Sequence, residues 1–237
     1  MTATMRRSVD VVLMEFDGVL AETSGARRDA LRTVLAEDGY PLSVEAYQES
    51  CAGLATADAV RAALARLDAT LDETDLELLA LRVDRAFSVQ VGKGVVLVDG
   101  VPEAIERLAA RARLGIVARA SRRDVELVLS MAQLDHAFAC VIGADDAYPA
   151  KPDPAPYRAA LRRLERTRPI ASDGIVVTLE DGLPGIRAAR AAGVRCIAVG
   201  DLPAHVAMEA DAIIPAITGL DLTTIGQLVG REGERFA

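Results

Sequence analysis

The sequence contains no tryptophan, and aromatic residues make up only 3% of its 237 residues. We therefore expect no aromatic platform for stacking bases or sugars. A basic surface for nucleic acid is also not expected, because 35 acidic residues outnumber 27 lysines and arginines and give a net charge of -8. With 18 glycines and 10 prolines, the chain is neither collagen-like nor of low complexity. The composition is that of a globular protein of one or two domains.

Long apolar runs and paired cysteines are lacking as well. The longest apolar runs, such as Val11–Met14 and Gly174–Leu179, are far shorter than the roughly 20 residues that a membrane helix needs. The three cysteines, Cys51, Cys140 and Cys196, are odd in number, and none has a partner at the spacing of a C-x-x-C motif. They indicate reduced thiols, and we expect a cytoplasmic protein with no membrane partner.

Short apolar runs rich in β-branched residues recur along the chain. They are Val9–Phe16, Leu114–Ala118, Phe138–Gly143, Gly174–Leu179, Arg195–Val199 and the weaker Asp211–Ile214. Such runs are typical of strands that are buried on both faces. Amphipathic helical stretches alternate with the later runs: Val101–Arg113, Arg122–Met131, Ala155–Arg166, Leu183–Ala192 and Pro203–Glu209. This alternation predicts an α/β fold, with a parallel sheet between two layers of helices in a Rossmann-like core.

The chain between the first and second predicted strands breaks this rhythm. It contains no convincing strand from Glu22 to Gly100, and its apolar residues follow a helical period. The predicted helices are Ser24–Asp38, Val44–Cys51, Thr56–Leu67 and Asp72–Gln90. Because such a block is too long for a loop, we predict a helical domain at 22–97, inserted into a core domain formed by 1–21 and 98–237.

Acidic residues follow two of the predicted strands, at the point where each strand ends. Glu15 and Asp17 follow the first strand, Glu180 and Asp181 follow the fourth, and Lys151 comes after the third. In open parallel sheets, ligands bind beyond the carboxyl ends of the strands. The sequence therefore predicts that these four acids and one lysine meet at one edge of the sheet.

Crowded carboxylates repel one another unless a cation neutralises them. Glu15, Asp17 and Asp181 offer the hard oxygen ligands that Mg²⁺ prefers, together with water and a substrate phosphate. Such an ion offsets the repulsion between a phosphoryl group and an attacking carboxylate. Lys151 is then a candidate clamp for phosphate oxygens, and Asp17 a candidate for passing a proton to and from the leaving group.

Three segments together resemble the motifs of the haloacid dehalogenase superfamily. They are MEFDGVLAET at Met14–Thr23, AKPDPAPYRAAL at Ala150–Leu161 and LEDGLPGIRAARAAGV at Leu179–Val194. Their order and spacing match, and the helical insert is similar to the cap of the β-phosphoglucomutase-like branch. The resemblance implies a Rossmann-like core, a mobile helical cap and Mg²⁺-dependent hydrolysis or transfer of phosphate. It also implies that Glu15, Asp17, Glu180 and Asp181 surround the metal, and that Gly18 lies in the phosphate-binding loop.

The first motif departs from the family pattern at the nucleophile. The family has Asp where this chain has Glu15. The extra methylene moves the carboxylate by roughly 1.5 Å, whereas about 1 Å of misplacement can cost on the order of a hundredfold in rate.

The second motif is altered too. The family has a Ser or Thr at the end of the second strand, where this chain has Ala118 or Arg119. Arg119 is either an anion ligand or a structural charge that pairs with Asp17 or Glu15. Ser121 either supplies a displaced hydroxyl to the substrate or caps the following helix.

The candidate substrate-binding residues of the insert are also atypical. The loop Ala52–Thr56, which contains Gly53, lacks the Arg often found there in the family, and Arg27 stands where sugar-phosphate mutases tend to have His. Two function hypotheses follow. The first is a weak phosphatase or phosphomutase-type enzyme, a monomer or homodimer whose partner is a small phosphorylated metabolite. The second is a catalytically inactive relative that acts by binding a ligand or another protein.

Overall fold

The computed structural model describes residues 8–52, 54–94 and 97–230. The chain divides into two compact units, 1–21 with 97–237 and 22–96, which we call the sheet unit and the helical unit. Leu97 pairs with Ala21 in an isolated antiparallel bridge. This pairing places Leu97 in the sheet unit, one residue before the boundary expected from the sequence.

Within the described ranges, the sheet unit has six parallel strands in the order β3-β2-β1-β4-β5-β6. The strands are β1 (Val9–Met14), β2 (Arg113–Val117), β3 (Phe138–Ile142), β4 (Ile175–Glu180), β5 (Arg195–Val199) and β6 (Ala212–Ile214). The chain runs outward from β1 to β3 and then continues on the other side of β1 with β4. The strand order therefore reverses between β1 and β4, which is where ligands bind in sheets of this kind.

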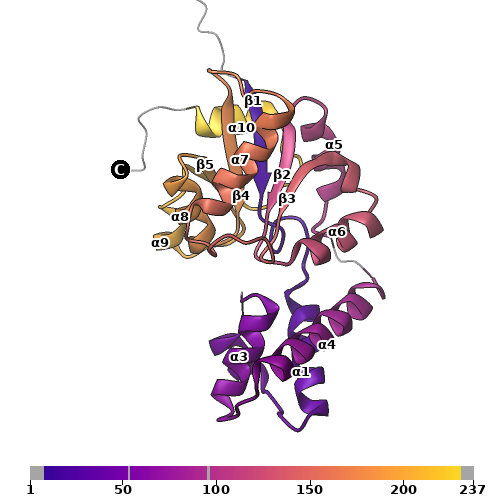
Figure 1. Ribbon diagram of the computed structural model, residues 1–237. Helices are drawn as coiled ribbons and strands as arrows, with labels where there is room; N and C mark the ends of the chain where they lie inside the picture. Colours follow the sequence, from indigo (N-terminus) through magenta and orange to yellow (C-terminus); the bar gives the residue numbers. More distant parts are fainter. Residues whose placement is uncertain (1–7, 53, 95–96, 231–237) are drawn as a thin grey trace, which may run out of the picture. The chain divides into compact units, whose positions relative to one another are not determined.

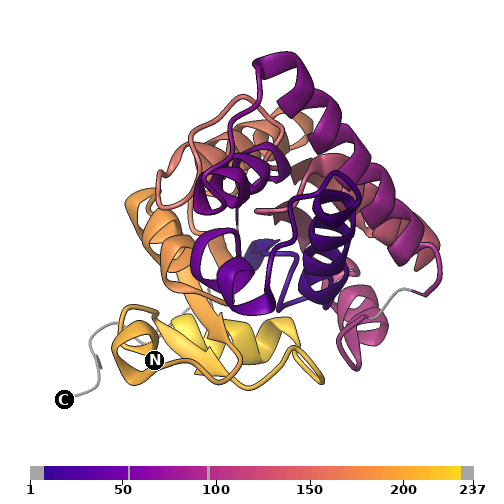
Figure 2. The same ribbon diagram turned by 90° about the horizontal axis from the view of Figure 1, so that it is seen from below.

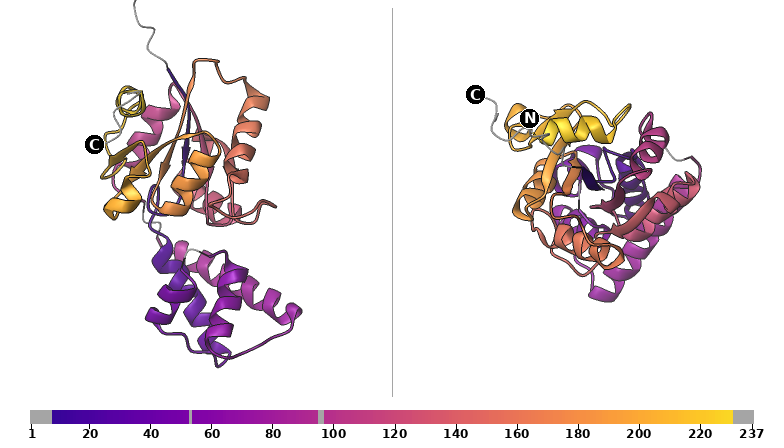
Figure 3. Two further views of the ribbon diagram at one scale, coloured as in Figure 1. Left: turned by 90° about the vertical axis from the view of Figure 1, so that its left-hand side faces the viewer. Right: turned by 90° about the horizontal axis from the view of Figure 1, so that it is seen from above.

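Helices cover both faces of this sheet. They are α5 (Val101–Ala109), α6 (Arg122–Met131), α7 (Ala155–Thr167), α8 (Leu183–Ala191), α9 (Ala204–Ala207) and α10 (Leu222–Val229). Figure 1 labels these elements, and the left view of Figure 3 shows α7 and the yellow α10 on opposite sides of the strands. The layered α/β fold expected from the sequence is confirmed. Across the described ranges, no helix combines the length and the apolar character needed to cross a bilayer.

The core of the sheet unit forms where β1 meets the helices. Val11 and Leu13 are fully buried and belong to one apolar cluster with Tyr157 of α7 and Ile186 of α8. Side chains on a strand alternate between the two faces. Because both faces of β1 are covered, its apolar run is continuous rather than alternating.

The helical unit contains α1 (Ser24–Glu37), α2 (Val44–Ser50), α3 (Thr56–Arg66) and α4 (Glu73–Val91), drawn from indigo to purple in Figure 2. Two of these helices begin at side-chain caps, because Ser43 accepts a hydrogen bond from the Ala46 N–H and Asp72 accepts one from the Asp75 N–H. α4 packs against both α1 and α3, and α2 packs against α3.

Two sequence predictions about helices of the sheet unit need correction, and one helix of this unit was not predicted. The stretch predicted at Val101–Arg113 is helical only to Ala109, because Arg113 is already the first residue of β2 and pairs with Val11. The stretch predicted at Pro203–Glu209 forms a single turn, α9. The helix α10 was not predicted, although Asp221 caps it by accepting a hydrogen bond from the Thr224 N–H.

Candidate active site at the strand ends

Three strands deliver the candidate site residues to one edge of the sheet. Glu15 directly follows β1 and its N–H still donates to Leu179 O of β4, at 2.9 Å. Glu180 is the last residue of β4, and Arg119 is the second residue after β2. Lys151 lies in the connection between β3 and α7, next to a cis Lys151–Pro152 peptide bond. The site therefore lies at the reversal of strand order.

Lys151 is the buried cation at the centre of this site. Its ammonium group donates to Glu15 Oε2 at 2.8 Å, to Glu180 Oε1 at 2.5 Å and to Val117 O at 2.6 Å. These contacts use all three donors of the group. Burial alone would lower the pKa of Lys151, but the two carboxylates outweigh it and raise the pKa, so the side chain is charged.

Both carboxylate oxygens of Glu15 are already bound to donors. Oε1 accepts from the Phe16 N–H at 2.8 Å and from the Arg119 N–H at 3.2 Å. Oε2 lies 2.8 Å from Lys151 Nζ and 3.6 Å from Arg119 Nε. Burial would raise the pKa of Glu15, but Lys151 and Arg119 outweigh burial and lower the pKa. Glu15 is therefore a fully buried, ionised carboxylate whose two oxygens both accept hydrogen bonds from donors of the chain.

Arg119 connects Glu15 to the acid that follows β4. Its Nη2 atom lies 3.3 Å from both carboxylate oxygens of Asp181. Arg119 therefore pairs with both Asp181 and Glu15. These contacts favour the role of a structural charge over that of an anion ligand for the substrate. Burial raises the pKa of Asp181 to about 6, and Glu15 adds to the rise, while Arg119 opposes it.

Glu180 shares Lys151 with Glu15 and is likewise buried. The Tyr157 hydroxyl donates to Glu180 Oε1, the atom that Lys151 also binds. Burial raises the pKa of Glu180 to about 7, which Lys151 opposes and the Glu15 charge reinforces. A side chain at Gly185 would overlap the Glu180 carboxylate. Glycine at this first turn of α8 therefore makes room for the acid.

Asp17 and Gly18 form the turn after β1. Asp17 is half-buried, and its charge acts on both Arg119 and Asp181. Gly18 has a φ of 78°, and a Cβ there would lie 2.6 Å from Asp181 Oδ2. Its N–H donates to Ala21 O at 3.0 Å. Gly18 therefore provides space for Asp181, and its N–H is used in the turn rather than offered to a phosphate.

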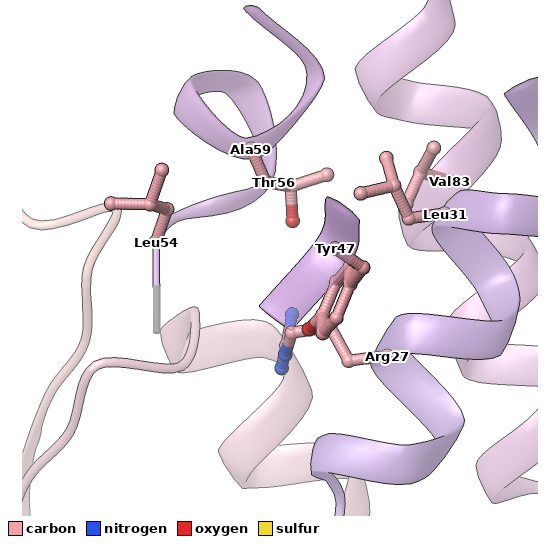
Figure 4. A pocket seen from close by; sticks show the side chains of 7 residues that line it. All are labelled: Arg27, Leu31, Tyr47, Leu54, Thr56, Ala59 and Val83. Atoms are coloured by element: carbon pink, nitrogen blue, oxygen red, sulfur yellow. The ribbon is translucent and has the colours of Figure 1, made fainter. Parts of the chain in front are cut away.

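Three further residues were predicted from the sequence to contact the substrate: Ser121, Gly53 and Arg27. Ser121 accepts a hydrogen bond from the Asp124 N–H at 3.1 Å and caps α6, which is one of the two roles expected for it. Gly53 lies outside the described residues. Arg27 belongs to the helical unit, where its guanidinium stacks 4.3 Å above the Phe87 ring. Figure 4 shows Arg27 beside Tyr47 in a small pocket of that unit.

The acidic side chains of this cluster suit a hard divalent cation. Glu15, Glu180 and Asp181 each offer an oxygen, and these oxygens lie within 4.8 Å of one another. With Asp17 there are four carboxylates around two cations, Lys151 and Arg119, which leaves an excess of negative charge when all are ionised. Oxygen ligands and unbalanced negative charge are both what Mg²⁺ requires, so the residues present fit the ion.

Sequence reasoning missed three groups that shape the site. They are the Tyr157 hydroxyl and two backbone groups, the Phe16 N–H and the Val117 carbonyl. The sequence does contain a signal for Tyr157, because it follows Lys151 by only six residues and lies in the first turn of α7. Backbone donors and acceptors carry no such signal, since every residue has them.

Comparisons with known proteins identify the family of the chain. Residues 12–199 match the family model described as haloacid dehalogenase-like hydrolase. The bifunctional riboflavin kinase/FMN phosphatase of Arabidopsis thaliana is 27% identical over 95% of this chain, which spans only 58% of that relative. Validoxylamine A 7'-phosphate phosphatase from Streptomyces hygroscopicus subsp. limoneus is 26% identical over 91% of this chain and 98% of its own.

The fold is likewise shared with solved structures. The crystal structure of CbbY from Rhodobacter sphaeroides in complex with phosphate aligns with a TM-score of 0.77 and 24% identity, over 90% of this chain and 96% of that one. A β-phosphoglucomutase from Clostridium difficile aligns with a TM-score of 0.78. The resemblance inferred from the three motifs is confirmed, since the family match covers most of the chain. The chain thus belongs to the haloacid dehalogenase-like hydrolases, and its curated relatives include phosphatases.

Proposed function

We propose that this protein hydrolyses the phosphate monoester of a small organic molecule in a Mg²⁺-dependent reaction with weak turnover. The observation that carries the proposal is the buried Lys151 ammonium, held between Glu15 and Glu180 at the reversal of strand order. A buried cation beside backbone N–H groups is a site for a phosphoryl group. The phosphatases among the relatives support the same reaction class.

The chain's own residues divide the work as follows. Glu15 is the candidate nucleophile: one of its oxygens bonds to phosphorus as the ester oxygen leaves, and water then hydrolyses the acyl phosphate. Asp17 gives its proton to the departing oxygen. Lys151, which donates to the Glu15 carboxylate in this structure, is the candidate clamp for the phosphate oxygens. Asp181, with Glu15, Asp17 and Glu180, would hold the Mg²⁺, which when bound neutralises charge on the phosphoryl group.

A catalytically inactive binding protein is the second candidate. It is favoured by the saturation of Glu15, whose two oxygens already meet the Phe16 and Arg119 N–H groups, Lys151 and the Arg119 guanidinium. A nucleophile needs an oxygen directed at the reacting atom. In this alternative, the protein retains the fold, and its site binds an anionic ligand without hydrolysing it.

An aryl phosphate assay separates the two candidates. We expect slow release of the phenol in the presence of Mg²⁺, its loss in EDTA, and its loss in Asp17→Asn and Asp181→Asn. Ser121→Ala is the matched control, since the structure assigns Ser121 to a helix cap. Turnover that survives both EDTA and Asp17→Asn contradicts the proposed mechanism. The absence of turnover with every small phosphate monoester tested favours the binding protein.

The proposal includes the partners and location expected from the sequence. The substrate is a small phosphorylated metabolite, and the enzyme acts in the cytoplasm as a monomer or homodimer. Neither nucleic acid nor a membrane is a partner in this proposal, in line with the net charge of -8.

A further inference from the structure

The donors around Glu15 form a complete anion-binding pocket. Two are backbone N–H groups at the ends of β1 and β2, from Phe16 at 2.8 Å and Arg119 at 3.2 Å. The others are the Lys151 ammonium at 2.8 Å and the Arg119 guanidinium at 3.6 Å. Convergent backbone N–H groups with an ammonium and a guanidinium form the kind of donor set that binds a phosphoryl group. Here a carboxylate of the chain itself accepts from the two N–H groups and the ammonium, and it forms an ion pair with the guanidinium.

The length of the Glu15 side chain brings the carboxylate to these donors. Its Oε1 atom bridges the N–H groups of two residues that are 103 positions apart in the sequence, Phe16 and Arg119. An aspartate at this position is shorter by one methylene, roughly 1.5 Å. A hydrogen bond of 2.8 Å or 3.2 Å that lengthens by about 1 Å is no longer a hydrogen bond. An aspartate in the same backbone would therefore leave the two N–H groups open.

We propose that the Glu15 carboxylate is a built-in competitor of the substrate: it occupies the place of the phosphoryl group, which binds only when this side chain swings out. The ligand class, a phosphate monoester or inorganic phosphate, rests on the proposed function. Phosphate oxygens then replace the carboxylate oxygens at the two N–H groups and at Lys151. Because the pocket is available only part of the time, the apparent affinity for phosphate falls by the fraction of time that it is open.

The surroundings of the pocket indicate how an anion enters. Phe16 is fully buried, and the Lys151 side chain is 3% exposed. The Arg119 side chain is 35% exposed, so an incoming anion meets the guanidinium first. When Glu15 leaves, Lys151 keeps Glu180 and the Val117 carbonyl as partners. The buried ammonium is therefore never without an acceptor during the exchange.

Calorimetric titration with inorganic phosphate tests this competition directly. Glu15→Asp keeps the charge but shortens the side chain, and Glu15→Ala removes both the charge and the competitor. If the pocket of the wild type is open for about a tenth of the time or less, both variants bind phosphate at least about tenfold more tightly. Asp181→Asn is the matched control: it removes a charge from the same cluster while Glu15 stays in place, and we expect less than a threefold gain.

Each outcome decides the proposal. Equal phosphate affinity of the wild type and Glu15→Asp overturns it, as does a gain in Asp181→Asn as large as that in Glu15→Ala, since the effect is then one of charge alone. Thermal melting shows whether the variants fold, and Glu15→Asp carries the test if Glu15→Ala does not. If Glu15→Asp binds phosphate tightly but hydrolyses no phosphate monoester, the proposed enzyme activity is contradicted and this inference stands. If the wild type hydrolyses phosphate monoesters and binds phosphate as tightly as Glu15→Asp does, the proposed enzyme activity stands and this inference is overturned.

Discussion

Replacement of Tyr157 by Phe isolates the contribution of one buried hydroxyl to the site. This hydroxyl donates to Glu180 Oε1 and lies 3.3 Å from Thr178 Oγ1, all within the core. A hydrogen bond to a charged acceptor contributes about 1.5–3 kcal/mol to stability. Glu180 keeps Lys151 as a partner in the variant, at 2.5 Å. We therefore expect a loss of about 2 kcal/mol in the free energy of unfolding.

Urea denaturation followed by far-ultraviolet circular dichroism measures this loss. With an m value of about 2 kcal/mol per molar urea, the unfolding midpoint falls by about 1 M. Tyr148→Phe is the matched control, because the Tyr148 side chain also packs against the core but its hydroxyl makes no hydrogen bond within the described residues. We expect that control to stay within about 0.5 kcal/mol of the wild type. A Tyr157→Phe midpoint equal to that of Tyr148→Phe would show that the hydrogen bond to Glu180 contributes no stability.

Two further predictions concern stability. Gly185→Ala is expected to destabilise the protein by 1 kcal/mol or more (~1–3 kcal/mol) in thermal or urea melts, because its Cβ overlaps the Glu180 carboxylate. Gly226→Ala in α10, whose Cβ meets only Val9 Cγ2 at 3.9 Å, is expected to stabilise it by up to about 1 kcal/mol; the same sign for both variants contradicts the packing argument. For Asp146, burial alone would raise the pKa, but a backbone N–H and two arginines outweigh it and lower the pKa. The stability that it contributes is therefore present above its ordinary pKa near 3.8 and is lost as the pH falls below that value. The difference in unfolding free energy between wild type and Asp146→Asn should accordingly shrink in acid and stay constant near neutral pH.

The sheet and the gathering of the acids were predictable from the sequence. Continuous apolar runs such as Val9–Phe16 indicate strands buried on both faces, and the carboxyl ends of parallel strands meet at one edge. These two facts bring Glu15, Glu180 and Lys151 together, as the structure shows. The helix ends were predicted less closely, because an amphipathic period does not mark the residue at which the chain leaves the helix.

The partners of individual side chains were not predictable in the same way. Ser121 has the residue type of both a cap and a ligand, and only the position of the Asp124 N–H decides between them. Arg119 was expected beside Asp17 or Glu15, and the structure adds Asp181, which lies 62 positions away. The departure at Glu15 was visible in the sequence. Its consequence was not, because the backbone N–H groups that bind the carboxylate are positioned by the fold of two strands.

The rate of aryl phosphate hydrolysis by Glu15→Asp, relative to the wild type, shows whether the length of the Glu15 side chain limits the reaction. A carboxylate that retreats by one methylene frees the two N–H groups and lies behind the phosphoryl group rather than in its place. Since about 1 Å of misplacement can cost on the order of a hundredfold in rate, we expect kcat/KM of Glu15→Asp to rise by about tenfold or more in Mg²⁺. A kcat/KM equal to or below that of the wild type, in a variant that folds, contradicts this expectation.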